Sequence, residues 1–170
     1  MSNVVLKTLT KSQLEEKFEE FLVASNFKIT FKDSSKSEVR ISDGIRRFDI
    51  FYILKNISSG GWKEKNSIFR IQVSNTKDVL VTTNSIRTHI ILGLVEYKGE
   101  DILVAWNSYR YVNHKTQRSC YVDESALDTC FNRGYIKVHD FDQETWLCRK
   151  ENFSLLIRDY LYFNYIGENE

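Results

Sequence analysis

The stretch from Asn107 to Arg118 holds the side chains best suited to contact with a polyanion. It carries three cationic residues and no acidic one, with two tyrosines, a histidine, two asparagines and a glutamine. Lysine and arginine neutralise phosphates, while arginine, asparagine and glutamine have the planar donor and acceptor geometry that reads base edges. An ordinary solvated hairpin loop is the plain alternative. The candidate DNA-contacting residues here are Asn107, Tyr109, Arg110, His114, Lys115, Gln117 and Arg118.

Formal charge is distributed unevenly along the chain, although the total is only +1. Residues 36–77 carry nine Lys/Arg against four Asp/Glu, a net of +5, and residues 107–118 add +3. Residues 119–170 carry five basic and ten acidic residues, a net of −5. This asymmetry predicts a basic face that attracts a polyanion and an acidic back that repels it. The candidates for positioning phosphates or bases in the first stretch are Arg40, Arg46, Arg47, Arg70 and Lys77.

A second chemistry is suggested by Glu96-Tyr97-Lys98, which matches the E-x-K half of a PD-(D/E)xK nuclease core. Asp78 or Asp49 would supply the upstream carboxylate for a divalent ion that activates water. The tripeptide runs directly into Gly-Glu and another strand, so it is expected at the end of a hairpin. A metal-dependent nuclease is therefore kept as an alternative rather than the first interpretation.

Other catalytic patterns are missing from the sequence. The three histidines are far apart and have no serine or acidic partner at triad spacing, and no phosphate-binding glycine loop is present. The cysteines are odd in number, widely spaced and without a CxxC pair, which predicts buried thiols rather than a metal site or a disulfide: Cys120, Cys130 and Cys148. No cofactor is expected.

Length and composition indicate one globular domain over residues 1–170. The apolar share is 42% and the aromatic share 14%, and no repeat or low-complexity linker divides the chain. There is no apolar run of about 18 residues and no signal-peptide core, so a cytoplasmic location away from membranes is expected. The polar end at 167–170 suggests the N-terminal part of a longer protein.

The spacing of apolar residues predicts mostly strands. Residues 11–26 form an amphipathic helix with Leu14, Phe18, Phe21 and Leu22 on one face and Thr10 or Ser12 as N-cap. Further helices are expected over residues 123–133 and 153–163. Strands are expected at 27–32, 38–41, 46–54, 68–74, 89–98, 101–106, 119–122, 135–138 and 145–149.

Short connections and the lack of βαβ alternation favour antiparallel pairing. The predicted fold class is α+β, mostly β: an antiparallel open pseudobarrel of about seven to eight short strands flanked by about two to three helices.

The order of these segments resembles that of a known family. A helix and basic strands are followed by F-R-I-Q-V, I-L-G-L-V-E-Y, I-L-V-A-W-N, an aromatic and basic loop, S-C-Y-V and a short helix. Over residues 37–160 this is similar to the B3-like pseudobarrel DNA-recognition domains of prokaryotic restriction endonucleases, such as those of McrB-type, LlaJI-like restriction subunits. The resemblance implies that two loop arms, Arg40–Arg47 and one within Asn107–Arg118, straddle the major groove of duplex DNA and that the domain itself does not cut.

The first hypothesis is therefore a non-catalytic, sequence-specific recognition domain for double-stranded DNA in a restriction or related defence system. Its further partner would be a nuclease subunit or motor domain of the same system. Two alternatives come from other classes. One is a metal-dependent nuclease using Asp78, Glu96 and Lys98, and the other is a protein-interaction module that uses the acidic residues 119–170 as its working face.

Overall fold

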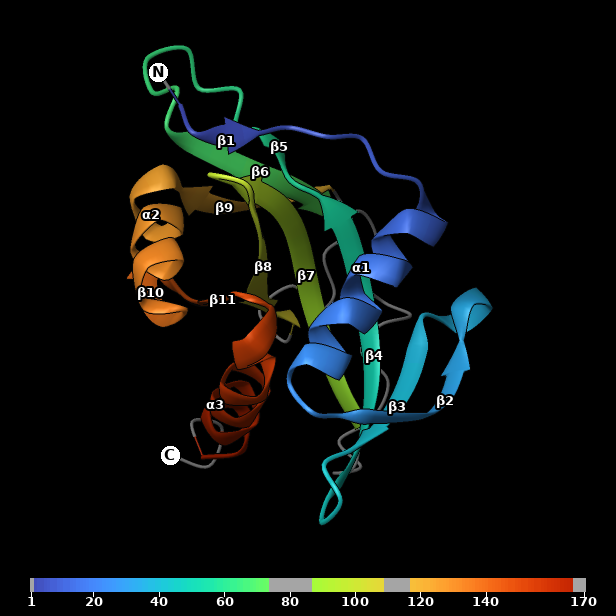
Figure 1. Cartoon of the computed structure of the whole chain (residues 1–170). Helices are drawn as coiled ribbons and strands as arrows, with labels where there is room; N and C mark the ends of the chain where they lie inside the picture. Colours follow the sequence, from blue (N-terminus) through green and yellow to red (C-terminus); the bar gives the residue numbers. More distant parts are fainter. Residues whose placement is uncertain (1, 74–86, 109–116, 167–170) are drawn as a thin grey trace.

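The computed structural model describes residues 2–73, 87–108 and 117–166, which form two β-sheets and three α-helices (Figure 1). The helices are α1 (Lys11–Ala24), α2 (Glu124–Arg133) and α3 (Phe153–Ile166). Short 3₁₀ turns lie at η1 (Ser34–Lys36) and η3 (Lys150–Asn152). None of the described helices is both long and apolar enough to cross a membrane.

The larger sheet has the strand order β10-β11-β8-β7-β4-β3-β2, with β1 paired to β7. Its strands are β1 (Val4–Val5), β2 (Lys28–Asp33), β3 (Glu38–Ser42), β4 (Arg47–Asn56), β7 (Arg87–Tyr97), β8 (Glu100–Asn107), β10 (Tyr135–Asp140) and β11 (Gln143–Cys148). The smaller sheet has the order β5-β6-β9, built from β5 (Ser58–Ser59), β6 (Ile68–Val73) and β9 (Arg118–Asp123).

The predicted class, α+β and mostly β with two to three helices, is confirmed, but the prediction of an antiparallel sheet is wrong at its centre. β4 and β7 pair in parallel, from Asp49 opposite Arg87 to Asn56 opposite Leu94. The chain builds β5 and β6 of the smaller sheet between these two strands, and such a long crossover permits parallel pairing. The larger sheet is mixed and is not closed into a barrel.

Local sequence accounts for the ends of the helices. The Thr10 hydroxyl accepts a hydrogen bond from the Gln13 amide N–H while the Gln13 side chain accepts one from Thr10 N–H, a capping box that starts α1. Asp123 caps α2 by accepting from Ser125 N–H, and Gly134, at a positive φ, ends it. The predicted inward face of α1 is confirmed by the burial of Leu14, Phe18, Phe21 and Leu22.

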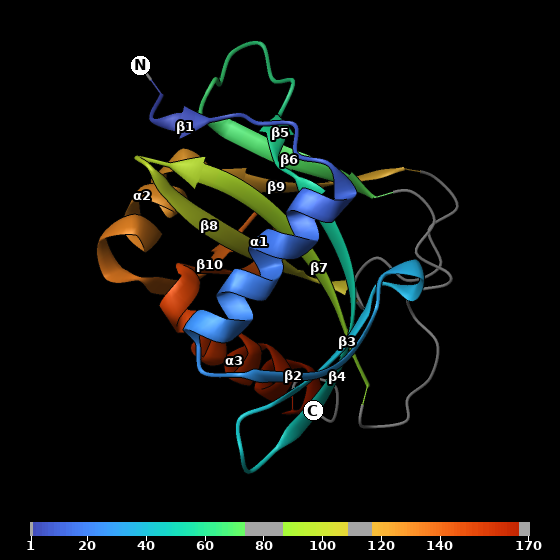
Figure 2. The same ribbon diagram turned by 45° about the vertical axis from the view of Figure 1, so that its right-hand side comes forward.

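Both faces of the larger sheet are buried, as the side chains of β7 show. Ile90, Leu92 and Leu94 belong to the core beneath α1 and α3, which we call the helix face. Ile91 and Val95 belong to a second core against the smaller sheet and α2, which we call the sheet face. Figures 1 and 2 show α1 lying across the larger sheet, with the smaller sheet toward the top of both views. A central strand buried on both faces explains the continuous apolar run in this part of the sequence.

The two sheets are joined by bonds as well as by apolar packing. The indole N–H of Trp106, at the end of β8, donates to the Tyr121 carbonyl in β9 at 2.9 Å. Lys55 Nζ of β4 donates to the Gln72 carbonyl of β6 at 2.6 Å. One cation of the basic stretch is thus used to hold the fold together.

All three cysteines are free and buried, which confirms the prediction of buried thiols. We expect them to resist Ellman's reagent in the native protein at pH 8 and to react fully in guanidinium chloride. The thiolate is the reactive form, and burial raises the pKa of Cys130 to about 12 and the pKa of Cys148 well above its ordinary value. Rapid release of thionitrobenzoate by the native protein would contradict this packing.

Candidate nucleic-acid interface

The two predicted arms converge at one end of the molecule, which we call the shared end. The parallel register places the start of β4 beside the start of β7, and Ile90 of β7 lies opposite Asn107 at the end of β8. In the smaller sheet, Val73 at the end of β6 lies opposite Arg118 at the start of β9. The Trp106–Tyr121 bond joins the larger sheet to the smaller one near these strand ends. In Figure 2 the end of β6, the start of β7, the end of β8 and the start of β9 lie toward the right-hand side, and the start of β4 lies at the bottom.

The 107–118 segment does not close a hairpin. β8 pairs with β7 and β11, whereas β9 pairs with β6, so the segment passes from one sheet to the other. Its first root is buried: Ser108 Oγ donates to the His89 carbonyl at 2.7 Å, and the Tyr160 hydroxyl donates to the same carbonyl at 2.5 Å. Its second root is the Arg118–Val73 pair. A segment rooted in both sheets has fixed ends from which to contact a ligand.

Several predicted contact residues lie outside the described residues: Lys77, Tyr109, Arg110, His114 and Lys115. Of the remainder, Gln117 and Arg118 are exposed and Asn107 is half-buried, all at the shared end. The direction of the Arg118 side chain follows from strand alternation, because Cys120 and Val122 of the same strand belong to the sheet-face core. Arg118 therefore faces the side on which the larger sheet lies.

Arg40 is engaged by acidic and aromatic neighbours. Its Nε lies 3.1 Å from Asp49 Oδ1, its Nη2 lies 3.7 Å from Glu38 Oε1, and its guanidinium lies 4.7 Å from the centre of the Phe31 ring. Much of its charge is therefore compensated within the protein. Phe31 is 42% exposed and was not predicted at this site. A register shift between Ile29 and Phe31 turns it to the same face as Arg40, and period-two spacing gives no sign of such a bulge.

Arg46 and Arg47 lie on opposite faces of the β3–β4 hairpin. Arg46 Nε lies 3.4 Å from Asp43 Oδ2, and its guanidinium lies 5.7 Å from the Phe48 ring on the helix face. There it borders a hollow of about 200 Å³ that Arg158 of α3 also lines. Arg47 is exposed and forms no ion pair with another described residue. Arg47 and Arg118 are thus the two predicted cations at the shared end that the described residues leave without a carboxylate partner.

Arg70 lies apart from the other predicted residues, on the outer surface of the smaller sheet. Its Nη1 is 3.5 Å from Ser119 Oγ, and it pairs across the strands with Tyr121. Hydrogen bonds from Trp62 and Ser119 and the nearby Arg70 lower the pKa of Tyr121. The Tyr121 ring centre lies 5.4 Å from that of Trp62 and 5.5 Å from that of Phe141. We call Trp62, Tyr121 and Phe141 the aromatic cluster. These residues are far apart in the sequence and come together only in the folded protein.

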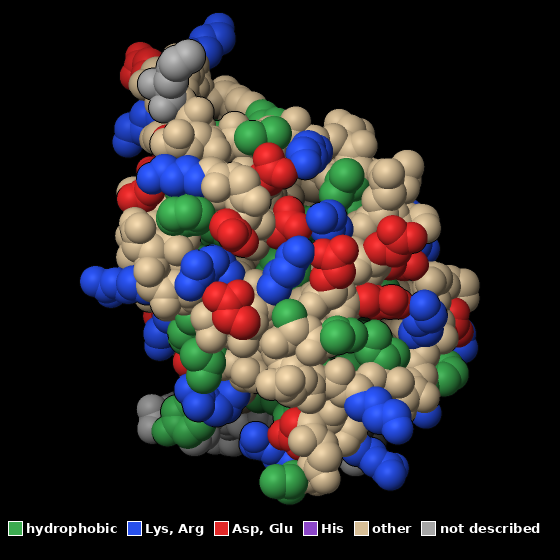
Figure 3. Space-filling model, in the orientation of Figure 1, with side chains coloured by type: hydrophobic (Ala, Val, Ile, Leu, Met, Phe, Trp, Pro, Cys, Tyr) green, Lys and Arg blue, Asp and Glu red, His purple; other side chains and the backbone are tan. Residues whose placement is uncertain are grey.

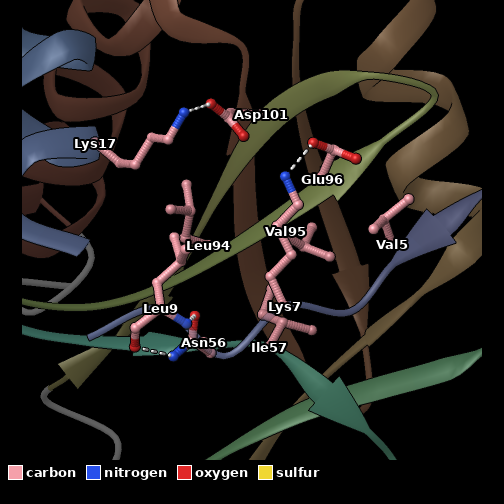
Figure 4. A pocket seen from close by; sticks show the side chains of 10 residues that line it. All are labelled: Val5, Lys7, Leu9, Lys17, Asn56, Ile57, Leu94, Val95, Glu96 and Asp101. Atoms are coloured by element: carbon pink, nitrogen blue, oxygen red, sulfur yellow. Dashed lines mark hydrogen bonds and ion pairs between the residues drawn. The ribbon is translucent and has the colours of Figure 1, made fainter. Parts of the chain in front are cut away.

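The carboxylate and lysine of the E-x-K tripeptide do not converge. Glu96 faces Lys7 at 2.7 Å in a small pocket of about 30 Å³, where Asp101 also binds Lys17 at 3.0 Å (Figure 4). Lys98 instead binds Asp128 of α2 at 3.0 Å. Asp49 pairs with Arg40, and Asp78 lies outside the described residues. Across the described ranges, no group of three or more His, Cys, Asp or Glu side chains is placed to hold a metal ion.

Charges of both signs are interspersed on the surface around α1 and α3 (Figure 3). Asp128 of the 119–170 stretch is paired with Lys98, which lies outside that stretch, whereas Glu151 and Asp159 pair with Arg149 and Arg158 within it. Of these three pairs, only the one with Lys98 reduces the net charge of the 119–170 stretch.

One comparison with known proteins is positive. A family model described as Methylase-associated X1 matches residues 48–157. No curated protein and no solved structure matches the chain significantly. The matched span runs from β4 into α3 and includes the 107–118 segment with its roots in both sheets, whereas α1, β2, β3 and the tip of the β3–β4 hairpin, including Arg47, precede it.

Proposed function

The chain belongs to the Methylase-associated X1 family, whose domains are tied to restriction–modification systems, and we propose that it recognises a specific duplex DNA sequence in such a system. In this role the domain binds DNA and contributes no catalytic residue. Modification or cleavage is carried out by the methylase, nuclease or motor that accompanies it. Two arms, the β3–β4 hairpin and the 107–118 segment, straddle the major groove in a B3-like manner.

The observation that carries this proposal is the placement of Arg47 and Arg118. They come from different sheets, both are exposed, and neither forms an ion pair with another described residue. Each belongs to a separate predicted arm, and both arms emerge at the shared end. An arginine that already binds a carboxylate must give up that partner to bind a phosphate, whereas an unpaired one does not. Arg40 and Arg46 are consequently weaker candidates for phosphate contact.

Titration of labelled duplex DNA at several salt concentrations tests the proposal. Near 0.1 M salt, Arg47→Ala and Arg118→Ala should each weaken binding about tenfold and reduce the slope of log affinity against log salt by about 0.9, because each removes one phosphate contact. Arg133→Ala is the matched control, since Arg133 is an exposed arginine at the far end of α2. Equal losses in all three variants, or no salt-dependent binding by the parent protein, would overturn the proposal.

The same titration separates base reading from phosphate contact. With a preferred site selected from random duplexes, Gln117→Ala should weaken binding to that site and leave binding to scrambled duplex nearly unchanged, because an amide pairs with base edges.

Adding magnesium and supercoiled plasmid tests the nuclease alternative. Nicking that is lost with Glu96→Ala would favour that alternative.

A second candidate function, docking onto a partner protein, is favoured by the aromatic cluster. Trp62 is exposed and lies beside Tyr121, which also neighbours Arg70, and tryptophan, tyrosine and arginine are enriched at the energetic centres of protein interfaces. This surface is on the outer side of the smaller sheet, away from Arg118. If the protein bound a methylase and not DNA, Trp62→Ala would weaken that complex while Arg47→Ala would not.

A further inference from the structure

Ile45 is the most exposed large hydrophobic side chain among the described residues, at 93%. It lies at the tip of the β3–β4 hairpin, between Gly44 and Arg46. Isolated apolar side chains that are partly exposed are ordinary on protein surfaces, and Val23 on α1, 64% exposed, is one. Ile45 differs from them because almost all of its surface is exposed to solvent.

The backbone that carries Ile45 is held in place by side-chain hydrogen bonds. Asp43 Oδ1 accepts from the N–H groups of Ile45 at 2.9 Å and Arg46 at 2.6 Å, which lowers the pKa of that carboxyl. Ser42 Oγ accepts from Gly44 N–H at 3.1 Å. Gly44 has a positive φ of 95°, which few other residues would tolerate. The tip is therefore a defined turn that presents one side chain outward.

Local stability does not account for isoleucine at this position. Tight turns favour glycine, asparagine and aspartate, and a β-branched side chain has no advantage there. An exposed isoleucine also gains nothing from the hydrophobic effect on folding, since its surface stays in water. A side chain that is held rigidly and contributes nothing to folding is well suited to contact a ligand.

The charged side chains around Ile45 indicate the chemical class of the ligand that it contacts. Arg46 and Arg47 follow it directly and lie on opposite faces of the hairpin, while the nearest carboxylate, Asp43, is occupied by two backbone N–H groups and by Arg46. An apolar tip beside the unpaired guanidinium group of Arg47 fits a polyanion that carries an apolar group between its charged edges. A two-stranded β-ribbon fits the major groove of DNA, which is about 12 Å wide and flanked by phosphates.

We propose that Ile45 recognises the C5-methyl group of a pyrimidine on the floor of the major groove, while Arg47, which has no carboxylate partner among the described residues, contacts a phosphate beside it. The inference rests on the proposed DNA-binding function. Among the groups that distinguish base pairs in the major groove, the thymine C5-methyl is the apolar one, and cytosine carries only a hydrogen at that position. A methyl group at C5 of cytosine occupies the same place, so thymine and 5-methylcytosine present the same chemistry to Ile45.

Matched duplexes test this contact and separate its two sources. The preferred site is prepared in its natural form, with uracil in place of thymine, and with 5-methylcytosine in place of cytosine. Loss of one buried methyl contact should weaken binding by the parent protein about fourfold. Ile45→Ala should weaken binding to the methyl-bearing duplex about tenfold and bind the forms with and without the methyl equally well. Val23→Ala is the matched control, because it shortens another exposed aliphatic side chain.

The salt dependence distinguishes failure of this inference from failure of the proposed function. Ile45→Ala should leave the slope of log affinity against log salt unchanged, because no phosphate contact is lost, whereas Arg47→Ala should lower it by about 0.9. Weaker binding to the uracil duplex identifies the thymine methyl, and tighter binding to the 5-methylcytosine duplex identifies the cytosine methyl. If Ile45→Ala distinguishes these duplexes as the parent does, or weakens all of them equally, the inference is wrong even though DNA binding stands. If Arg47→Ala and Arg118→Ala are also without effect, the proposed function fails with it.

Discussion

Replacing Trp106 with alanine should destabilise the protein by about 3–5 kcal/mol, the usual cost of removing a large aromatic side chain from a core. Trp106 is fully buried in the core between the two sheets. The truncation also removes the indole N–H that donates to the Tyr121 carbonyl at 2.9 Å. For a protein of this length we expect the melting temperature to fall by roughly 6–20 °C. Urea unfolding followed by circular dichroism measures the loss.

Two further variants separate the cost of the lost hydrogen bond from the cost of the lost apolar volume. Trp106→Phe keeps most of the apolar volume but leaves the Tyr121 carbonyl without its donor, so about 1–3 kcal/mol of the loss should remain. Trp62→Ala is the control for removing a tryptophan, because Trp62 lies at the surface and its loss should cost much less. A Trp106→Ala protein that melts with the parent would show that the sheets are not held together in this way.

The Trp106 variants also bear on the proposed function. Trp106 immediately precedes the 107–118 segment, and its bond to β9 holds the two roots of that segment together. We therefore expect Trp106→Phe, measured at a temperature at which it is fully folded, to bind duplex DNA more weakly than the parent. If the two roots of the 107–118 segment can move apart, its side chains are no longer held in one orientation, and binding weakens although no charge has been removed.

The individual elements were predictable from the sequence because each has a regular period. Apolar residues three and four apart identified α1, and alternation or continuous apolar runs identified β3, β4, β7 and β8. The two-residue strands β1 and β5 were not predicted, since they are too short to show a period. The parallel β4–β7 pair and the division into two sheets were also missed, because pairing between distant strands leaves no local signal.

The residue types of the candidate site could be predicted from the sequence, but the contacts between its residues could be predicted only in part. The Asp43-Gly44 turn implies that Arg40 lies opposite Asp49 across the β3–β4 hairpin, so the ion pair that engages Arg40 could have been inferred by counting back from the turn. The position of Phe31 beside Arg40 could not have been inferred, because the bulge in β2 that turns Phe31 outward leaves no sign in the spacing of the neighbouring residues. The aromatic cluster was missed for another reason: its members come from a loop, β9 and the β10–β11 turn, which only the folded chain brings together.

Introducing a single methyl group at Gly93 should also destabilise the fold, by about 1–3 kcal/mol. Gly93 lies in β7 on the sheet face, and a Cβ atom there would come within 2.7 Å of Ile57 Cγ1 and 2.9 Å of Trp106 Cζ3. Both neighbours are buried, and the hydrogen bond from Ile57 N–H to the Leu94 carbonyl at 3.0 Å limits how far the backbone can move apart. Removing a glycine from a strand would by itself stabilise the protein by roughly 0.5–1 kcal/mol, which is too little to offset the overlap.

A double-mutant cycle with Ile57 tests whether this overlap is the cause. Ile57→Ala alone should cost about 2–5 kcal/mol, because it leaves a cavity beneath β7. In the Gly93→Ala/Ile57→Ala double variant the new methyl group occupies part of that cavity and meets no Ile57 Cγ1. We therefore expect the double variant to be more stable than the sum of the single effects by about 1–3 kcal/mol. Strict additivity of the two free energies of unfolding would mean that the residues do not meet, and the packing of β7 against the chain leading into the smaller sheet would have to differ from that described.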